Sequence, residues 1–251
     1  MSDFIIIGGG IAGISAAARL SALGSVTVLE AEGALAHHAS GRSAALYEPR
    51  YGAPAVVELS LASEAYFRAA EHVLSPRGLM SVAKADQRAA FDAEVRDFQL
   101  EEVSVDAARA VVPVLNPEVV AFAAVADHAW DIDTDLLLQG FAREAKGRGA
   151  QIVTGARASA IRRGGEGWQV VTPQGEFTGR VLVNAAGAWV DQVAVMAGVR
   201  PLGFRPLRRS MARIPAPGGH DVVEDCGQEG WGGVGVGDGG RQQLGQPKGK
   251  D

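Results

Sequence analysis

Three glycines with the spacing Gly8-x-Gly10-x-x-Gly13 constrain the fold of this chain more than any other feature. They follow residues 4–7, a run of bulky apolar side chains that predicts a strand buried on both faces. They open an alanine- and leucine-rich segment over residues 11–23, which predicts a helix, and residues 26–29 predict a second buried strand. Strand, helix and strand in this order form a βαβ unit of the dinucleotide-binding type.

Each part of this unit has a physical role in holding a dinucleotide. Gly8 allows the tight turn, Gly10 lets the backbone approach a pyrophosphate, and Gly13 lets helix and strand pack closely. The helix N-terminus offers free N–H groups and a positive dipole end to the phosphates. Glu30, at the end of the second strand, can accept hydrogen bonds from ribose hydroxyls. A glycine turn that merely joins strand to helix is the alternative, and the fingerprint alone does not separate NAD from FAD.

The composition excludes several classes of protein. The chain has 251 residues, of which 47% are hydrophobic and 21% charged, and a net charge of −5, so it lacks the basic face that a nucleic-acid partner requires. The single cysteine, Cys226, excludes an intrachain disulfide framework and a CxxC metal site, and no metal site is expected. We find no signal-peptide pattern and no apolar run suited to an integral membrane segment, and we expect a cytoplasmic protein.

The remaining pattern predicts an α/β chain. Helices are expected over residues 56–72, 87–99, 105–112 and 136–147, the last capped by Asp133 or Thr134. Strands are expected over residues 80–83, 122–125, 151–153, 159–161, 168–171, 176–178 and 181–183. The acidic residues 131–135 are expected to form a turn.

Two segments rich in small residues favour a cofactor longer than NAD. Residues 37–45 read HHASGRSAA, a loop that can run close beneath a long cofactor, and residues 181–189 read VLVNAAGAW, a strand followed by a second small-residue turn. Together with the GGGIAG start, these segments resemble the D-amino-acid oxidase superfamily of FAD enzymes, of the glycine oxidase and D-amino-acid dehydrogenase type. Within it the likeness is to D-arginine dehydrogenases, and it extends over roughly residues 4–213.

The resemblance implies a set of FAD-binding residues. The pyrophosphate group is expected to contact the glycine turn, and the ribose is expected to contact Glu30. The adenine is expected to contact the backbone of one later residue, and the flavin is expected to contact two small-residue segments. In full, the implied cofactor-binding residues are Gly8, Gly10, Ile11, Ala12, Gly13, Glu30, Ser40, Gly41, Arg42, Ser43, Ala44, Ala158, Ala185, Ala186, Gly187 and Trp189. Packing is an alternative role for the large apolar side chain of Trp189.

The resemblance also implies a domain division. A Rossmann-like FAD-binding domain is expected from residues 1–50 and 135–200, and an inserted mixed-sheet substrate domain from residues 51–134 and 201–217. Residues 218–251 contain 12 glycines in 34 residues and are expected to form an irregular tail. Family members continue with a longer substrate sheet, so we expect a chain that is truncated or frame-shifted at its C-terminus.

For the substrate, the resemblance implies Tyr51 at the active-site mouth and Arg209 on a substrate carboxylate, to which a guanidinium can bind bidentately. A solvated basic turn is the alternative for Arg209. Leu46 and Leu79 stand where D-arginine dehydrogenases carry a histidine and an acid, which favours small or apolar amines over cationic ones. His37, His38 and His128 are not expected to act as catalytic bases, because no acidic partner is visible near the paired histidines.

The expected function is FAD-dependent oxidation of the CH–NH group of a small D-amino acid or related amine, with the electron acceptor left open. The first alternative is an FAD-dependent 2-hydroxy-acid dehydrogenase. The second is a non-catalytic, truncated flavin-binding remnant.

Overall fold

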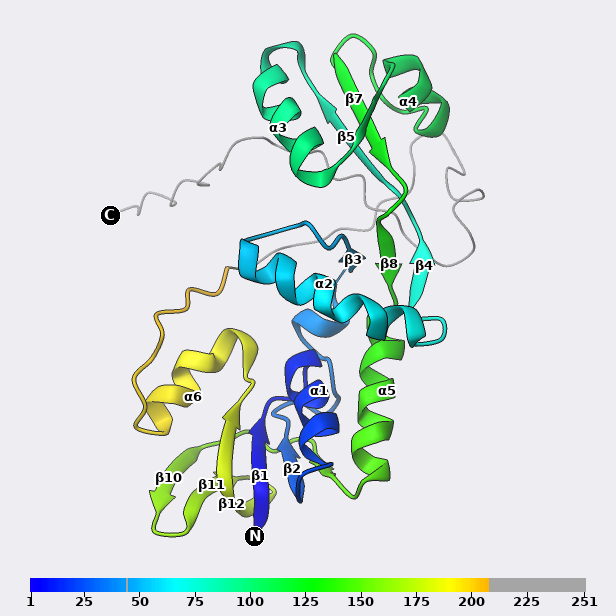
Figure 1. Cartoon of the computed structure of the whole chain (residues 1–251). Helices are drawn as coiled ribbons and strands as arrows, with labels where there is room; N and C mark the ends of the chain where they lie inside the picture. Colours follow the sequence, from blue (N-terminus) through cyan, green and yellow to red (C-terminus); the bar gives the residue numbers. More distant parts are fainter. Residues whose placement is uncertain (44, 208–251) are drawn as a thin grey trace, which may run out of the picture. The chain divides into compact units, whose positions relative to one another are not determined.

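The computed structural model describes residues 1–43 and 45–207, which form two compact units (Figure 1). Unit 1 contains residues 1–43, 45 and 133–207, and unit 2 contains Leu46–Ile132. Residues 201–207, which the sequence grouped with the substrate domain, cluster with unit 1. Unit 1 is therefore discontinuous in sequence, with unit 2 inserted between its two parts.

Unit 1 is built on a six-stranded sheet of order β10-β11-β12-β1-β2-β9. Strands β12, β1, β2 and β9 run parallel, whereas β10, β11 and β12 form antiparallel pairs, so the sheet is mixed. The bounds are β1 (Ser2–Ile7), β2 (Val26–Leu29), β9 (Gln151–Val153), β10 (Ala160–Gly164), β11 (Gly167–Thr172) and β12 (Gly175–Asn184). The α/β class expected from the sequence is confirmed.

Strand β12 corrects one prediction. The sequence favoured two strands, over residues 176–178 and 181–183, but β12 runs without interruption through Gly179. A Cβ atom at Gly179 would lie 2.7 Å from Cγ1 of Ile5 on the neighbouring strand β1. This glycine therefore marks a close approach of two strands and does not break one.

The helices of unit 1 are α1 (Ile11–Leu20), α5 (Thr134–Gly147) and α6 (Val190–Met196), with 3-10 turns η1 (Ala39–Gly41) and η3 (Gly187–Trp189). Helix α1 packs against α5, whereas α6 contacts β10 and β12. The backbone N–H of Leu136 donates to Oδ1 of Asp133 at 2.7 Å, which confirms the predicted cap of α5.

The central strand β1 is buried on both faces. Ile5 and Ile7 pack in one cluster with Leu29 of β2 and Val193 of α6. Strand alternation points the fully buried Ile6 to the opposite face. Consecutive apolar residues in β1 thus reflect a sheet covered on both sides, as the sequence predicted.

Unit 2 contains two three-stranded sheets whose paired strands are antiparallel. One has β3 (Leu46–Tyr47), β8 (Trp130–Ile132) and β4 (Leu74–Pro76), and the other has β5 (Leu79–Ala83), β7 (Phe122–Ala126) and β6 (Glu101–Val103). The helices are α2 (Pro54–Ala69), α3 (Arg88–Phe98) and α4 (Val105–Val111), with the 3-10 turn η2 (Ala85–Gln87). A small core joins Ala83, Phe91, Leu100 and Ala124.

The shortest strands of unit 2 were not predicted. Strand β3 has two residues and strands β4, β6 and β8 have three each, too few for a periodic pattern. Strand β8 also includes Asp131 and Ile132, the first two residues of the acidic segment that was expected to form a turn. Among the described residues, no helix combines the length and the apolar character that a bilayer crossing requires.

Candidate cofactor-binding site

The turn between β1 and α1 tolerates only glycine at two positions. Gly8 has a φ angle of +112°, and a Cβ there would overlap the carbonyl oxygen of Ala185. A Cβ at Gly13 would overlap the carbonyl oxygen of Gly8, because the first turn of α1 lies directly on the end of β1. Both glycines therefore permit the close packing that brings a helix N-terminus to the edge of the sheet.

Three chain segments meet at this edge. Ile7 is in register with Leu29 on one side and Asn184 on the other, so β1, β2 and β12 end together. The N–H of Gly8 donates to the carbonyl of Leu29 at 2.9 Å, and the N–H of Ala185 donates to the carbonyl of Ile7 at 2.9 Å. The glycine turn, Glu30 and the turn after β12 consequently lie side by side at the carboxyl ends of parallel strands, where α/β sheets bind nucleotides.

Glu30 is held in place by backbone donors. Its side chain is almost fully buried, and its carboxylate accepts hydrogen bonds from the N–H groups of Gly9 and, at 2.8 Å, of Glu32. Because each carboxylate oxygen has two lone pairs, both oxygens can accept a further hydrogen bond. The expected role on a ribose hydroxyl fits this geometry.

The loop that contains Ser40 folds over the start of α1. The Ser40 hydroxyl accepts a hydrogen bond from the N–H of Ile11 at 3.0 Å, and a Cβ at Gly10 would lie 3.1 Å from this oxygen. Gly41 is equally constrained, since a Cβ there would overlap the carbonyl oxygen of Ala36. Ile11, Ala12 and Gly13 occupy the first turn of α1, where N–H groups have no partner within the helix. Such a turn suits an anionic pyrophosphate.

Other residues of this loop are less constrained. Arg42 and Ser43 are exposed, and the guanidinium of Arg42 donates to the carbonyl of His37 at 3.0 Å. Ala44 lies outside the described residues. The structure therefore brings Ser40 to the glycine turn and places Gly41 against Ala36. The contributions of Gly41, Arg42, Ser43 and Ala44 to cofactor binding stay predictions.

The turn after β12 is shaped by a residue that the sequence analysis did not assign. The side-chain amide of Asn184 donates to the carbonyl of Val190 at 2.7 Å, and its oxygen accepts from the N–H of Ala186 at 3.3 Å. Gly187 follows with a φ angle of +53°. An asparagine directly after a buried strand is the sequence signal that could have identified this role.

Trp189 and Ala158 differ in their surroundings. The Trp189 side chain is partly exposed, and its ring lies 4.6 Å from the ring of His38, on the loop that contains Ser40. Ala158 is half-buried and packs against the cluster around Ile5 and Ile7. Trp189 thus contacts the loop proposed to run along the cofactor and is not part of the buried core.

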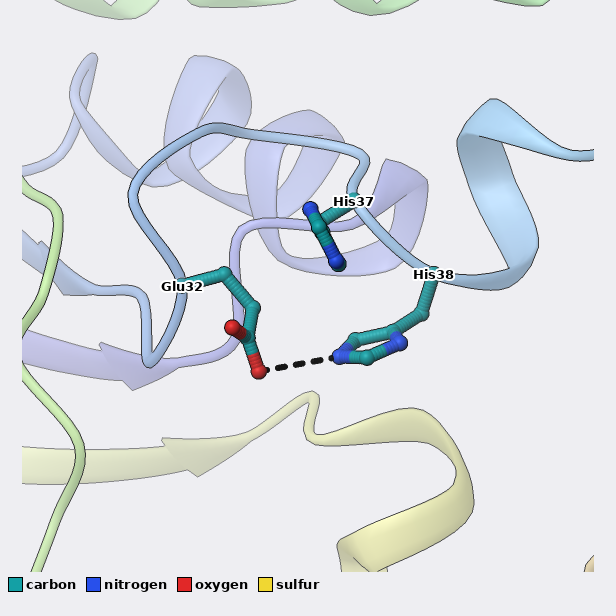
Figure 2. A group of neighbouring side chains, drawn as sticks. All are labelled: Glu32, His37 and His38. Carbon is teal, nitrogen blue, oxygen red and sulfur yellow. Dashed lines mark hydrogen bonds and ion pairs between the residues drawn. The ribbon is translucent and has the colours of Figure 1, made fainter.

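Glu32, His37 and His38 form a cluster beside this site (Figure 2). His38 Nε2 lies 3.1 Å from Glu32 Oε1, and the hydrogen bond with His38 holds the pKa of Glu32 below its ordinary value. The same carboxylate oxygen lies 2.8 Å from the guanidinium of Arg157. The expectation that the paired histidines have no acidic partner is therefore wrong, because the loop returns to Glu32, five and six residues upstream.

Of the two substrate residues expected from the sequence, the structure describes Tyr51 alone. Tyr51 belongs to unit 2, is 68% exposed, and follows a turn in which its N–H donates to the carbonyl of Glu48 at 3.1 Å. Its ring lies 6.1 Å from that of Phe98. Arg209 lies outside the described residues. The roles of Tyr51 and Arg209 remain predictions.

Asp191 is a second residue that the sequence analysis missed. Its carboxylate accepts hydrogen bonds from the backbone N–H groups of Leu202, Gly203 and Phe204, at 2.9, 2.8 and 2.7 Å. It thereby fixes the backbone of residues 202–204, which directly precede Arg205. An acidic residue in the first turn of a helix does not reveal such a distant partner, so no local signal was available.

Comparison with known proteins supports FAD as the cofactor. The family profile described as DAO, FAD dependent oxidoreductase, matches residues 3–236. One subunit of the anaerobic glycerol-3-phosphate dehydrogenase of Escherichia coli is 27% identical over 243 residues, covering 90% of this chain and 44% of that protein.

Solved structures share the fold. Glycine oxidase from Geobacillus kaustophilus has a TM-score of 0.69 at 24% identity, covering 78% of this chain and 58% of that one. L-α-glycerophosphate oxidase from Mycoplasma pneumoniae, with FAD bound, also has a TM-score of 0.69. It is 21% identical, and the match covers 78% of this chain and 57% of that one. The chain thus spans less than half the length of the curated relative and less than two thirds of these solved chains.

Proposed function

This chain belongs to the DAO family of FAD-dependent oxidoreductases, and from that premise we propose that it oxidises the CH–NH group of a small D-amino acid or related amine. Its cofactor is FAD. The observation that carries the oxidoreductase assignment is the cradle in which Gly8, Gly13 and Glu30 meet at one sheet edge. The preference for an amine rests on the motif resemblance and on the structural likeness to glycine oxidase.

Residues of unit 1 would hold the dinucleotide. The first-turn N–H groups of α1 would receive the pyrophosphate, and Glu30 would accept a ribose hydroxyl. Ser40 fixes the loop over this turn through the N–H of Ile11. When bound, FAD supplies the acceptor for a hydride.

Residues outside this cradle would bind and orient the substrate. The amine loses a hydride from its α-carbon and a proton from nitrogen, and water hydrolyses the resulting imine to a keto acid and ammonia. Arg209 would bind the substrate carboxylate bidentately and Tyr51 would line the entrance, with unit 2 acting as the substrate domain. Leu46 and Leu79 provide no charge for a cationic side chain, which favours small or apolar amines.

A second candidate is oxidation of a CH–OH group, as in the 2-hydroxy-acid alternative. This candidate is favoured by the similarity of the chain to a subunit of a glycerol-3-phosphate dehydrogenase and to an L-α-glycerophosphate oxidase. A flavin-binding remnant without turnover is the third candidate.

The test is anaerobic reduction of the FAD-loaded protein, followed by visible absorption. Glycine, sarcosine, D-alanine, D-proline and D-arginine are compared with lactate and glycerol 3-phosphate. Bleaching by a small amine supports the proposal, whereas bleaching by the hydroxy compounds alone supports the second candidate. A bound flavin that no compound reduces supports the remnant.

A variant pair tests the carboxylate site. Arg209→Ala should raise the KM for an amino acid by roughly 10- to 100-fold, since a lost charged hydrogen bond costs about 1.5–3 kcal/mol. Arg205→Ala is the matched control from the same arginine-rich segment and should leave KM within about twofold. Equal effects of both variants would contradict a specific role for Arg209.

A further inference from the structure

Glu32, His37 and His38 place three metal-binding donors together on one loop. The loop follows β2, and one ligand atom from each residue lies within 4.8 Å of the other two (Figure 2). Glu32 Oε1 and His38 Nε2 are separated by 3.1 Å. We propose that these three side chains form a binding site for a divalent transition-metal ion such as Zn²⁺.

The donor set is suited to this ion. Two imidazoles and one carboxylate are a ligand combination that Zn²⁺ uses in open sites, where water takes the fourth position. With ligand bonds of about 2.1 Å, tetrahedral ligand atoms are separated by about 3.4 Å. One pair already has such a separation, and rotation of the exposed histidine rings can close the remaining distances.

The backbone of the loop is already fixed. The N–H of Ala36 donates to the carbonyl of Gly9 at 3.1 Å, and the N–H of Gly41 donates to the carbonyl of His38 at 3.2 Å. Arg42 additionally bonds the carbonyl of His37. Because these contacts hold both histidines near Glu32 without an ion, metal binding would order side chains and little backbone.

One cation competes with the metal. The guanidinium of Arg157 lies 2.8 Å from Glu32 Oε1, the same oxygen that faces His38. The carboxylate has a second oxygen for an ion, but the positive charge of Arg157 opposes it. The affinity is therefore expected to be moderate, and removal of Arg157 should raise it. An increase in Zn²⁺ affinity when Arg157 is removed is expected only if Glu32 is a metal ligand. A histidine–glutamate ion pair that binds no metal would not show this increase.

The sequence did not predict this site, because the histidines stand next to each other and the acid lies five residues before the first. That spacing matches no common metal motif, and only the return of the loop brings the three together. The proposal does not depend on the function proposed above, and its test uses protein without FAD.

The experiment measures Zn²⁺ binding to the full chain, purified without a histidine tag, by equilibrium dialysis and metal analysis. His220 and Cys226, which lie outside the described residues, are replaced in every sample (His220→Ala, Cys226→Ser) so that they add no ligand. Substitution by Co²⁺ gives a second readout, because tetrahedral Co²⁺ has strong visible absorption bands. We expect one Zn²⁺ per chain with a dissociation constant in the micromolar range, about −8 kcal/mol.

Three variants decide the assignment. His37→Ala and His38→Ala should each weaken Zn²⁺ binding by roughly 10-fold or more, the size of effect seen even for groups that only orient ligands. Arg157→Gln should tighten it by about 2- to 5-fold, the contribution of an exposed ion pair. His72→Ala is the matched control, since His72 also lies near an acid, Glu71, at 3.3 Å, and it should change nothing.

Absence of Zn²⁺ binding at about 1 mM would overturn the proposal. So would binding that is unchanged in the double variant His37→Ala, His38→Ala. Circular dichroism of each variant checks that these exposed substitutions leave the fold intact.

Discussion

Helices α5 of unit 1 and α2 of unit 2 have similar lengths but opposite surroundings. Five side chains of α5 are buried: Leu137, Leu138, Phe141, Ala142 and Ala145. None of the sixteen residues of α2 is buried, although α2 is the more apolar segment, and Val56, Leu59 and Leu61 are exposed. The apolar residues of α5 are segregated on one face, which fits its burial, whereas those of α2 are spread more widely around the helix.

The same contrast separates the two units. In unit 1 the second half of β1 and the whole of β2 are buried, and the cofactor cradle contains backbone groups and the buried side chain of Glu30. In unit 2 the expected substrate residue, Tyr51, is exposed. We therefore expect substitutions at tightly packed positions of the cradle in unit 1 to affect stability and cofactor binding together, and substitutions at exposed positions of either unit to affect neither strongly.

The largest effect is expected at Gly13. In Gly13→Ala the new methyl group would overlap the carbonyl oxygen of Gly8, which forces α1 away from β1 and should cost roughly 3 kcal/mol of unfolding free energy. FAD affinity should fall with it. The matched control is Gly33→Ala, because a Cβ at Gly33 meets nothing within 4 Å. Urea unfolding measures both, and equal stability of the two variants would contradict the packing argument.

The next effect compares the two helices directly. Leu138→Ala in α5 removes a fully buried side chain and should cost about 2–5 kcal/mol. Leu59→Ala in α2 removes a side chain that is 70% exposed and should change the unfolding free energy by no more than about 0.5 kcal/mol. Denaturant titration of both variants measures this difference. A large loss in Leu59→Ala would show that α2 is buried in solution.

A smaller effect is expected at the loop over α1. Ser40→Ala removes the acceptor for the N–H of Ile11 and should cost about 1 kcal/mol, as for a lost helix cap. Ser43→Ala, at an exposed position in the same loop, is the control and should have no measurable effect. Thermal unfolding distinguishes them, and identical melting temperatures of the two variants would refute the capping role.

The smallest effect is electrostatic and lies at the start of β1. Hydrogen bonds from the N–H and hydroxyl of Ser25 hold the pKa of Asp3 below its ordinary value of 3.8. The ionised form is favoured by folding, so its stabilisation is present above the ordinary pKa and disappears as the pH falls through the lowered pKa. Ser25→Ala should move the Asp3 pKa upward in an NMR titration. Because the backbone N–H remains in this variant, an unchanged pKa would mean that the hydroxyl hydrogen bond is not formed in solution.

The sequence was sufficient for the parts of unit 1 that depend on local pattern. The glycine turn, the acid after β2 and the cap at Asp133 are each defined by residues within a few positions of one another. Contacts between distant residues could not be predicted in this way. Ser40 and Ile11 are separated by 29 positions, and the partners of Asp191 follow it by 11 to 13 positions.

Short strands and glycines within strands were the other source of error. Strands β4, β6 and β8 exist because a neighbour pairs with them, and their three residues carry no independent signal. Gly179 suggested a break in β12, yet its role is to let Ile5 of β1 approach. In both cases tertiary packing decided the structure where local preference was weak.

The most direct test of the central claim is an equilibrium titration of the purified chain with FAD, followed by flavin fluorescence. If residues 8–13, Glu30 and the turn after β12 form a cradle, FAD should bind one per chain with a dissociation constant of about 1 µM or below, and Gly13→Ala should weaken it while Gly33→Ala does not. Failure to bind FAD at about 100 µM, or equal affinity in both glycine variants, would contradict the account.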